Sequence, residues 1–391
     1  MNVKILSCWF TTSYGTYTNG LRRALERRLG HEVGMIASNC GCGDPMEVGR
    51  KFMDLRCEFV ELVNVPYYKK SNAVKEWLMV QARQVVYRER ARRYLKLTGN
   101  AEVLHFQQIL NAFGSVTVFN WLDMPCTAAR VVTVHELDAY QQQHPELGSN
   151  YNKADGIIVH TDGMRDKLVS LGVHASHIEV VQHGIEIRPV YERPRGGIVY
   201  YLGHKLNASK GLITILTSLA LLKKELGPEA PLLTIHGHYG GTAPEEGLQI
   251  AREAGVEGSV RWLNEISFDA AVDLYQGSQL CVLPYTGSFA GYPATLAMAN
   301  GLPVIGTREA GLPEHLGDAG VWVERNDPSG FAAAILRLLN DEAERRRIAE
   351  CGRARAEREL AWDVIAQKTI GVYEKAMEKK FAFPDRADRA R

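Results

Sequence analysis

The sequence has no excess of charge of either sign and no run of apolar residues as long as a membrane span. Its 46 Lys and Arg are balanced by 45 Asp and Glu, which leaves a formal net charge of +1. A protein with so little net charge is not expected to bind nucleic acid by attraction to the charged phosphate backbone. The most apolar stretch, at residues 212–222, is short and contains Thr214, Thr217 and Ser218. We therefore predict no membrane-spanning helix.

Cysteine pairing motifs are also missing. The seven cysteines form an odd, scattered set without a C-x-x-C pair: Cys8, Cys40, Cys42, Cys57, Cys126, Cys281 and Cys351. Such a set is typical of a reducing compartment. Cys40 and Cys42 have no matching His or Cys partners, so no metal site is expected. The opening MNVKILSCWF lacks a cleavage pattern and predicts a first strand instead of a signal peptide, which favours a cytoplasmic location.

The chain length favours two hydrophobic cores, because single cores stop growing below this size. Strand-like runs alternate with helical patterns in both halves, which predicts two α/β domains with doubly wound parallel sheets. The strand-like runs lie at 4–10, 31–37, 59–63, 102–106, 129–134 and 156–160, and again at 198–203, 232–237, 260–263, 280–285, 303–307 and 320–324.

Domain boundaries follow from composition. Residues 187–197 are rich in Pro, Arg and Gly, which predicts a linker between a first domain at 1–190 and a second at 191–365. An amphipathic stretch at 362–379 has no sheet of its own to cover, so the segment 366–391 is expected to return to the first domain as a crossover helix followed by a charged tail.

Loops that follow strands are the candidate site, because open parallel sheets bind ligands at the carboxyl ends of their strands. In the first half, residues 11–20 place Gly15 and Thr16 before a helix expected at 19–28, where free amides favour an anion. A tight turn into the helix is the alternative. His135 ends the strand VVTVH beside Glu136 and Asp138, and it is either a site residue or a structural histidine.

Two loops of the second half carry polar groups. The loop at 203–211 contains His204, Lys205 and Lys210 just before a helix. A lysine there would stabilise the negative charge that gathers on a departing diphosphate, and a chance cluster of surface charge is the alternative. The loop at 262–267 contains Asn264, Glu265 and Ile266, whose main-chain groups are candidates for holding a nucleotide base.

The loop at 284–293 is the most informative. It brings hydroxyls and two glycines to the start of an Ala-rich helix at 294–300, which has the form of a phosphate cradle. Its candidate residues are Thr286, Ser288, Ala290, Gly291 and Tyr292. The alternative is a Gly-rich turn that only lets the helix pack close to the sheet.

Together these segments resemble the GT-B family of retaining glycosyltransferases, in particular the group 1 or family 4-like enzymes typified by sucrose synthase and the mannosyltransferases of cell-wall lipid synthesis. The resemblance covers nearly the whole chain. It rests on GHEV at 30–33, VLHFQ at 103–107, VVTVHE at 131–136, VVQHGIE at 180–186, YLGHKLNASKG at 201–211, the run GLPVIGTREAGLPEHLGDAGVWVERNDP at 301–328, and Leu-Ala-Trp at 360–362.

This resemblance implies a GT-B fold, with two Rossmann-like domains facing across a cleft. It implies that a sugar moves from a nucleotide-diphosphate sugar to a sugar, lipid-linked or small-molecule acceptor, with retention of anomeric configuration and without a metal or other cofactor. It also implies roles for individual residues. The catalytic set is His135, Lys205 and Lys210, and the donor-binding set is Gly15, Thr16, His204, Asn264, Glu265, Ile266, Thr286, Ser288, Ala290, Gly291, Tyr292 and Leu296.

The sequence departs from the family pattern at two places. His204 stands where the family has a phosphate-binding Arg, and the loop is one residue longer, so Lys205 is the candidate substitute. The two glutamates of the E-x₇-E motif fall on Ser288 and Leu296, so the donor cannot be identified from this motif. The alternatives are a non-catalytic homologue that binds a nucleotide sugar or a partner transferase, and a nucleotide-sugar epimerase.

A basic stretch at 69–96 mixes nine Lys and Arg with Trp77, Leu78 and Tyr94. It predicts a helix, either one that packs its apolar stripe on the first sheet or one that lies on an anionic membrane surface and gives access to a lipid acceptor. The second interpretation would place the protein at the inner face of the membrane.

Overall fold

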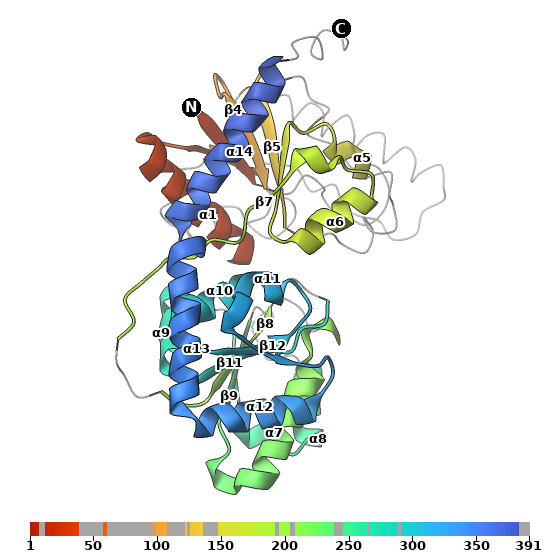
Figure 1. Ribbon diagram of the computed structural model, residues 1–391, viewed down its shortest axis with the longest axis vertical. Coiled ribbons are helices and arrows are strands. Elements are labelled where there is room, and N and C mark those ends of the chain that lie inside the picture. Colours follow the sequence, from red (N-terminus) through yellow and green to blue (C-terminus); the bar gives the residue numbers. More distant parts are fainter. Residues whose placement is uncertain are drawn as a thin grey trace. The chain divides into compact units, whose positions relative to one another are not determined.

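The computed structural model describes residues 1–7, 12–38, 58–60, 96, 98–107, 122, 126–135, 148–191, 195–203, 208–237, 245–264, 266–287 and 291–382. The chain forms two compact units. The first comprises Met1–Gln182 and Ile365–Arg391, and the second comprises His183–Val364 (Figure 1). The basic stretch at 69–95 lies outside the described residues.

In its described part, the first unit is built on a parallel sheet of seven strands in the order β3-β2-β1-β4-β5-β6-β7. The strands are β1 (Val3–Ser7), β2 (Gly34–Ser38), β3 (Glu58–Val60), β4 (Val103–Gln107), β5 (Ala129–Val134), β6 (Gly156–Val159) and β7 (Ile178–Val180). Every residue of β4 and of β6 is buried, as expected for strands covered on both faces. The predicted strands are confirmed. The unpredicted β7 has only three residues, too few for a pattern of its own.

The described helices of the first unit are α1 (Thr12–Leu29), α5 (Gly148–Tyr151), α6 (Asp162–Ser170) and most of α14 (Trp362–Ala382). Helix α6 begins where the Thr161 hydroxyl accepts a hydrogen bond from the amide of Met164 at 3.1 Å, a standard N-cap. Helix α1 ends at Leu29, and the next residue, Gly30, has a φ of +73°, as predicted for a residue just beyond a helix.

The start of α1 differs from the prediction. The sequence suggested a loop at 11–20 and a helix from about residue 19, whereas the helix begins at Thr12. Local propensity is a weak guide, because Gly, Thr and Tyr each cost only a fraction of a kcal/mol to about 1 kcal/mol in a helix. Tyr17 and Leu21 are completely buried, and their packing outweighs that cost.

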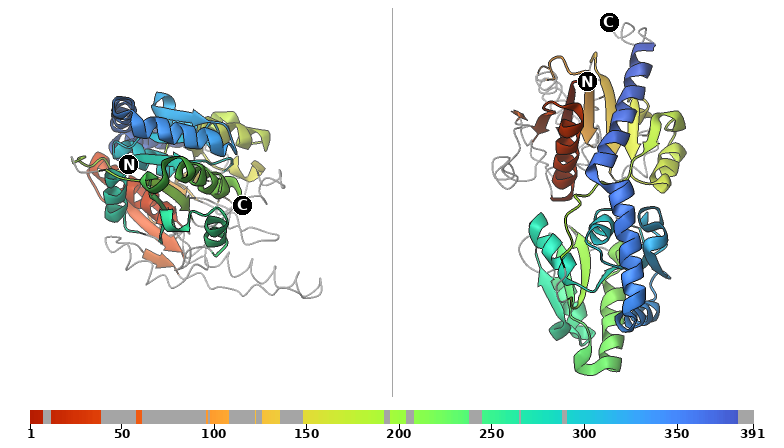
Figure 2. Two further views of the ribbon diagram at one scale, coloured as in Figure 1. Left: turned by 90° about the horizontal axis from the view of Figure 1, so that it is seen from below. Right: turned by 60° about the vertical axis from the view of Figure 1, so that its left-hand side comes forward.

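Helix α14 returns to the first unit, as the crossover prediction requires. From Ile365 onward it belongs to that unit, and the right-hand view of Figure 2 shows it running beside the strands. The Tyr373 hydroxyl lies 2.7 Å from Nδ1 of His105 in β4. A β-carbon added at Gly156 of β6 would lie 3.3 Å from the Val372 side chain. The helix therefore packs directly on the strands.

The second unit has a parallel sheet of six strands in the order β10-β9-β8-β11-β12-β13 in its described part. The strands are β8 (Ile198–Gly203), β9 (Leu233–Gly237), β10 (Val260–Leu263), β11 (Leu280–Leu283), β12 (Val304–Thr307) and β13 (Gly320–Val323). Its helices include α7 (Leu212–Leu226), α8 (Glu245–Glu253), α9 (Phe268–Gly277), α10 (Gly291–Ala299), α11 (Leu312–Leu316), α12 (Pro328–Asn340) and α13 (Glu342–Arg355). All six strands were predicted.

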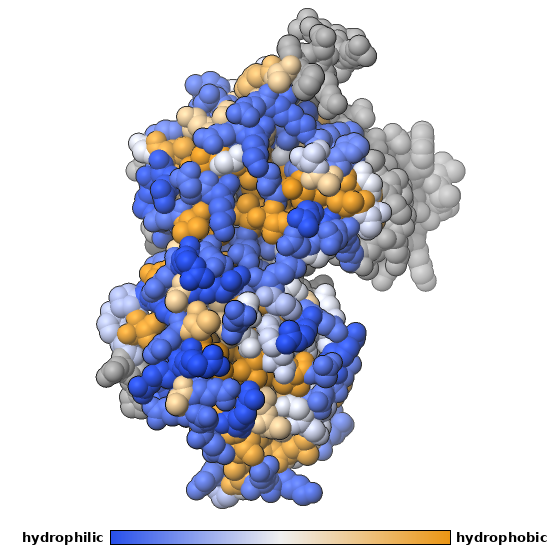
Figure 3. Space-filling view, in the orientation of Figure 1, coloured by the Kyte–Doolittle hydropathy of each residue, from blue (hydrophilic) through white to orange (hydrophobic). Residues whose placement is uncertain are grey.

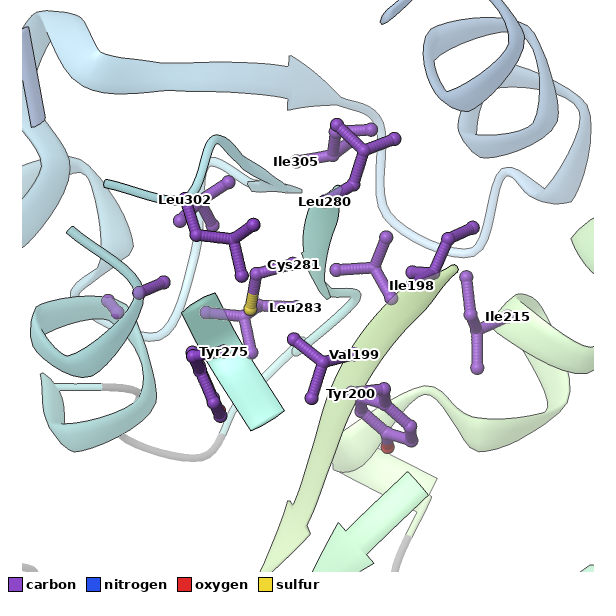
Figure 4. Close-up of a cluster of buried hydrophobic side chains, with 14 of the residues drawn as sticks. Ile198, Val199, Tyr200, Ile215, Tyr275, Leu280, Cys281, Leu283, Leu302 and Ile305 are labelled. Atoms are coloured by element: carbon purple, nitrogen blue, oxygen red, sulfur yellow. The ribbon is translucent and has the colours of Figure 1, made fainter. Parts of the chain in front are cut away.

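The core of the second unit lies between this sheet and its helices. Figure 4 shows side chains of β8 and β11 meeting Ile215 of α7 and Tyr275 of α9. Cys281 is completely buried there, and burial raises the pKa of its thiol. It therefore acts as a small apolar residue, as the scattered cysteines predicted.

The two chain segments that lead into and out of the second unit are paired within it. The amide of Ile185 donates to the carbonyl of Leu360 at 2.9 Å, and the amide of Trp362 donates back to Ile185 at 3.2 Å. A β-carbon at Gly184 would lie 2.2 Å from the Trp362 ring. Only glycine fits at this position.

Hydrophilic residues cover most of the face shown in Figure 3, and apolar residues gather only in small areas. Among the described helices, none has the length and apolarity needed to cross a bilayer.

Candidate functional site

The loops after β8 and β11 lie side by side, because these strands are neighbours in the second sheet. From β8 the chain continues to β9 on one side of this pair, and from β11 it continues to β12 on the other side. Open α/β sheets bind ligands where the strand order reverses in this way. The amide of Thr286 donates to the carbonyl of Ser209 at 2.8 Å. A β-carbon at Gly211 would lie 2.2 Å from the carbonyl oxygen of Pro284. The predicted loops at 203–211 and 284–293 therefore meet.

Lys210 makes a main-chain and a side-chain contact at this junction. Its carbonyl accepts a hydrogen bond from the Tyr200 hydroxyl at 2.8 Å. Its ammonium lies 4.2 Å from the centre of the Tyr285 ring, where the negative face of the ring attracts a cation. The Tyr285 hydroxyl donates to the carbonyl of Tyr201, and burial raises the pKa of Tyr285 well above its usual value. The ring is thus neutral and fixed, and it positions the charge of Lys210.

Helix α10 begins at Gly291, just after the described end of the loop that follows β11. The first amides of an α-helix have no partner within the helix, which suits them to bind an anion. The Tyr292 ring centre lies 6.1 Å from that of Tyr201. Leu296 is completely buried in the hydrophobic core. Its side chain therefore has no surface for a ligand.

The loop after β10 contains Asn264 and Ile266, both half-buried. Ile266 packs against the core of the second unit. This placement leaves the main chain of the loop as the part that would hold a base. Several predicted site residues lie outside the described part of the chain: His204, Lys205, Glu265, Ser288 and Ala290, together with Glu136 and Asp138 beside His135.

In the first unit, His135 follows β5 with an exposed fraction of 7%. Its Nδ1 lies 3.1 Å from Nε2 of His160, and its Nε2 lies 2.9 Å from Oε1 of Gln107. The Tyr17 ring packs against it nearly at a right angle, with ring centres 4.8 Å apart. Gly15 and Thr16 lie in the same helix as Tyr17, and Gly15 is in its first turn. His135 is thus oriented by three different elements.

Two polar residues at this strand edge were not predicted as part of the site. Gln107 ends β4, and His160 directly follows β6. Both are buried. The available signal was their position, since each stands where a buried strand ends, as His135 does. Their adjacency depends on the strand order, which a single sequence does not display.

Burial keeps two histidines of this cluster neutral. It lowers the pKa of His160 to about 4. For His105 of β4, burial first and the nearby His160 second lower the pKa to about 3. Both histidines would titrate near their ordinary value of 6.5 in the unfolded chain. The folded state is therefore the one that resists protonation.

This difference predicts a loss of stability in mild acid. The unfolded chain binds more protons than the folded chain below pH 6.5, so the stabilisation is complete above that pH and is lost as pH falls toward 4. Each histidine contributes about 1.4 kcal/mol per pH unit in that window. Denaturant unfolding at about pH 7.5 and about pH 5.5 measures the slope, to which the buried His236 of the second unit adds with the same sign. His160→Gln should reduce the dependence of the unfolding free energy on pH by the contribution of one histidine. An unchanged slope would contradict the assignment.

Comparison with known proteins identifies the family. Residues 196–341 match the family model described as "Glycosyl transferases group 1", and residues 12–184 match that described as "Glycosyl transferase 4-like domain". The chain belongs to the group 1 glycosyltransferases. The two matched regions correspond to the two sheet-containing parts of this group 1 chain.

Several relatives are similar over part of their length. The D-inositol 3-phosphate glycosyltransferase of Corynebacterium kroppenstedtii is 28% identical over 250 residues, which cover 58% of this chain and 55% of that protein. The glycogen synthase of Mycobacterium tuberculosis is 26% identical over 291 residues, which cover 70% of this chain and 68% of that one. The chain spans about half the length of the first of these relatives.

Solved structures show the same fold. Anabaena Alr3699/HepE in complex with UDP-glucose has a TM-score of 0.71 at 14% identity, covering 95% of this chain and 100% of that chain. The sucrose-phosphate synthase of Thermosynechococcus elongatus has a TM-score of 0.70 at 18% identity, covering 96% and 99%. The predicted GT-B fold of two Rossmann-like units is confirmed for this group 1 chain.

Proposed function

We propose that the protein is a glycosyltransferase that moves a sugar from a nucleotide-diphosphate sugar to an acceptor, with retention of anomeric configuration. The observation that carries the proposal is Lys210, whose ammonium lies over the Tyr285 ring where the loops after β8 and β11 meet. Membership of the group 1 family supports the same activity. The complexes of HepE with UDP and with UDP-glucose make a nucleotide-diphosphate donor the natural choice for this fold.

In the proposed reaction, the second unit binds the donor diphosphate. Lys210 and the first amides of α10 face the phosphate oxygens, and Thr286 adds polar groups beside them. Charge builds on the diphosphate as its bond to the sugar breaks, and a lysine about 4 Å away contributes roughly 4 kcal/mol of attraction at an effective dielectric constant of about 20. Cations and helix amides then neutralise the leaving group without a metal. The family resemblance of the sequence predicts that Lys205 and Ser288 also contact the donor.

The first unit supplies His135 to the transferred sugar, and the amides at the start of α1 supply further donors near Gly15. His135 suits this role because its orientation is fixed by His160 and Gln107 on neighbouring strands. A group that is already oriented stabilises a transition state without reorganising when the reaction occurs.

Lys210→Ala should weaken binding of a nucleoside diphosphate by roughly tenfold to a hundredfold, the usual contribution of a charged hydrogen-bond partner. Binding of the corresponding nucleoside should not change, because Lys210 is assigned to the phosphates alone. Titration calorimetry with both ligands measures the difference. Lys223→Ala is the matched control, since Lys223 lies on the adjacent helix α7 with its ammonium on the carbonyl of Gly255. Equal losses for nucleoside and nucleoside diphosphate would remove Lys210 from the phosphate site.

The activity itself is tested by incubating the protein with UDP-, GDP-, ADP- and dTDP-sugars, with and without a polyol, an oligosaccharide or a lipid-linked acceptor. Transfer or donor hydrolysis supports the proposal, and the anomeric configuration of the product decides retention. Binding without turnover would instead indicate a non-catalytic homologue, a possibility raised by Ser288 and Leu296 at the usual glutamate positions. A changed stereocentre in the donor sugar would indicate an epimerase.

A further inference from the structure

A chain of buried hydrogen bonds extends beyond His135 in both directions. On one side, Nδ1 of His160 lies 2.9 Å from the carbonyl oxygen of Val181, just after β7. On the other side, the amide nitrogen of Gln107 lies 3.2 Å from Nε2 of His105. The exposed fractions of His160, Gln107 and His105 are 2%, 1% and 0%. These side chains are shielded from water, so their partners determine which atoms carry protons.

The chain continues to the C-terminal helix. Nε2 of His105 also lies 2.7 Å from the Thr133 hydroxyl, and its Nδ1 lies 2.7 Å from the hydroxyl of Tyr373 on α14. Tyr373 is completely buried. The hydrogen-bonded path therefore joins the ends of three strands to a helix that comes from the far end of the sequence.

The direction of the bonds around His160 can be deduced. A carbonyl oxygen only accepts hydrogen bonds. Nδ1 of His160 therefore carries a proton and donates a hydrogen bond to the carbonyl of Val181. A neutral imidazole has one N–H, so Nε2 of His160 carries a lone pair. Burial keeps His160 neutral, with its pKa lowered to about 4. Nδ1 of His135 must then be the donor of the 3.1 Å bond between the two rings.

Nδ1 of His135 consequently carries a proton whether the ring is neutral or charged. Nε2 is the nitrogen whose role changes. In the charged ring it donates to the amide oxygen of Gln107, 2.9 Å away. In the neutral ring it accepts, and the Gln107 amide must present its nitrogen instead. Tyr17 on α1 and His160 after β6 are titratable groups that face His135.

We propose that His160 is a positioning residue that holds His135 in the Nδ1–H form, so that Nε2, which faces Gln107 in this structure, is the nitrogen that exchanges this partner for a hydroxyl of the donor sugar. This inference rests on the proposed function, because it takes His135 as the residue that contacts the sugar. A residue that only filled space in the core would not select one tautomer of its neighbour.

Histidine-ring NMR on the ¹⁵N-labelled full-length protein tests the inference directly. The spectrum of His135→Asn assigns the His135 signals by their disappearance. At a pH where the ring is neutral, we expect Nδ1 of His135 to give the signal of a protonated nitrogen and Nε2 that of an unprotonated one. An Nε2–H form in the natural protein would overturn the proposal.

Two isosteric variants separate positioning from packing. In His160→Gln the side-chain oxygen replaces Nε2 as the acceptor for His135, whereas in His160→Asn the amide replaces Nδ1 and keeps only the bond to Val181. We expect His160→Gln to retain the Nδ1–H form. We expect His160→Asn to show both tautomers and to lose roughly tenfold to a hundredfold in kcat, the range that an unpaired buried donor costs. Thermal unfolding checks that both variants fold.

The same spectrum and rate for the two variants would overturn the positioning role. Failure of the proposed function has a different signature, because full transfer activity in His135→Ala would remove His135 from the reaction whatever the tautomer in the natural protein.

Discussion

His135→Ala is expected to lower the rate of sugar transfer by about a hundredfold or more, the usual effect of removing one oriented donor from a transition state. The chain should still fold. The substitution leaves the Nε2 of His160 and the amide of Gln107 without this partner, which costs about 1–3 kcal/mol of stability. Initial rates measured well below the unfolding temperature keep the two effects apart.

A matched control distinguishes chemistry from instability. Ile157→Val shortens a completely buried side chain in β6 of the same unit and should cost about 0.5–1.5 kcal/mol with little change in rate. If His135→Ala turns over its donor as fast as Ile157→Val does, His135 takes no part in the reaction and the assignment of the first unit to the sugar is wrong.

Gly291→Val is expected to abolish binding of the donor. Gly291 is buried at the first position of α10, and the proposal brings the donor diphosphate against the amides of that turn. Without a β-carbon, the main chain can approach the phosphates closely. The branched side chain of valine would occupy the space that the phosphate oxygens need. Calorimetry with a nucleoside diphosphate should detect no binding at concentrations that saturate the natural protein.

Gly277→Val provides the comparison for this experiment. Gly277 ends α9 in the same unit, and a β-carbon there has no neighbour within 4 Å. This variant should bind the nucleoside diphosphate normally. Thermal unfolding without ligand verifies that Gly291→Val remains folded. Normal binding by folded Gly291→Val would show that the diphosphate lies elsewhere.

Most strands could be predicted from the sequence because a parallel strand buried on both faces is a continuous apolar run. The strands at 129–134 and 198–203 were predicted with the bounds that β5 and β8 have. The edge strand at 260–263 was also predicted with the bounds of β10, although its residues are only partly buried or exposed. The short β7 was missed, since three residues carry too little pattern. The start of α1 was misplaced, because the buried contacts of Tyr17 and Leu21 outweigh the weak helix propensity of the residues before them.

The candidate site was predicted in part. Lys210, Thr286 and Gly291 were identified because they follow buried strands, and the strand order does bring their loops together. Tyr285 was noticed only as part of its loop, since nothing in the sequence shows that its ring lies beneath the ammonium of Lys210. Leu296 was named from its alignment with a family motif, and the structure places it in the core.

The sequence by itself determined that this protein has two parallel-sheet units and that polar residues follow their strands, because both features depend on neighbours along the chain. Only the tertiary structure decided which of those residues meet. Gln107 and His105 come from β4, Tyr373 comes from α14, and His135 and His160 directly follow β5 and β6. Their hydrogen bonds join residues as many as 268 positions apart. The proton positions of His160 and His135 follow from the order of the strands, and the path reaches Tyr373 through the return of α14. Neither is a local property of the sequence.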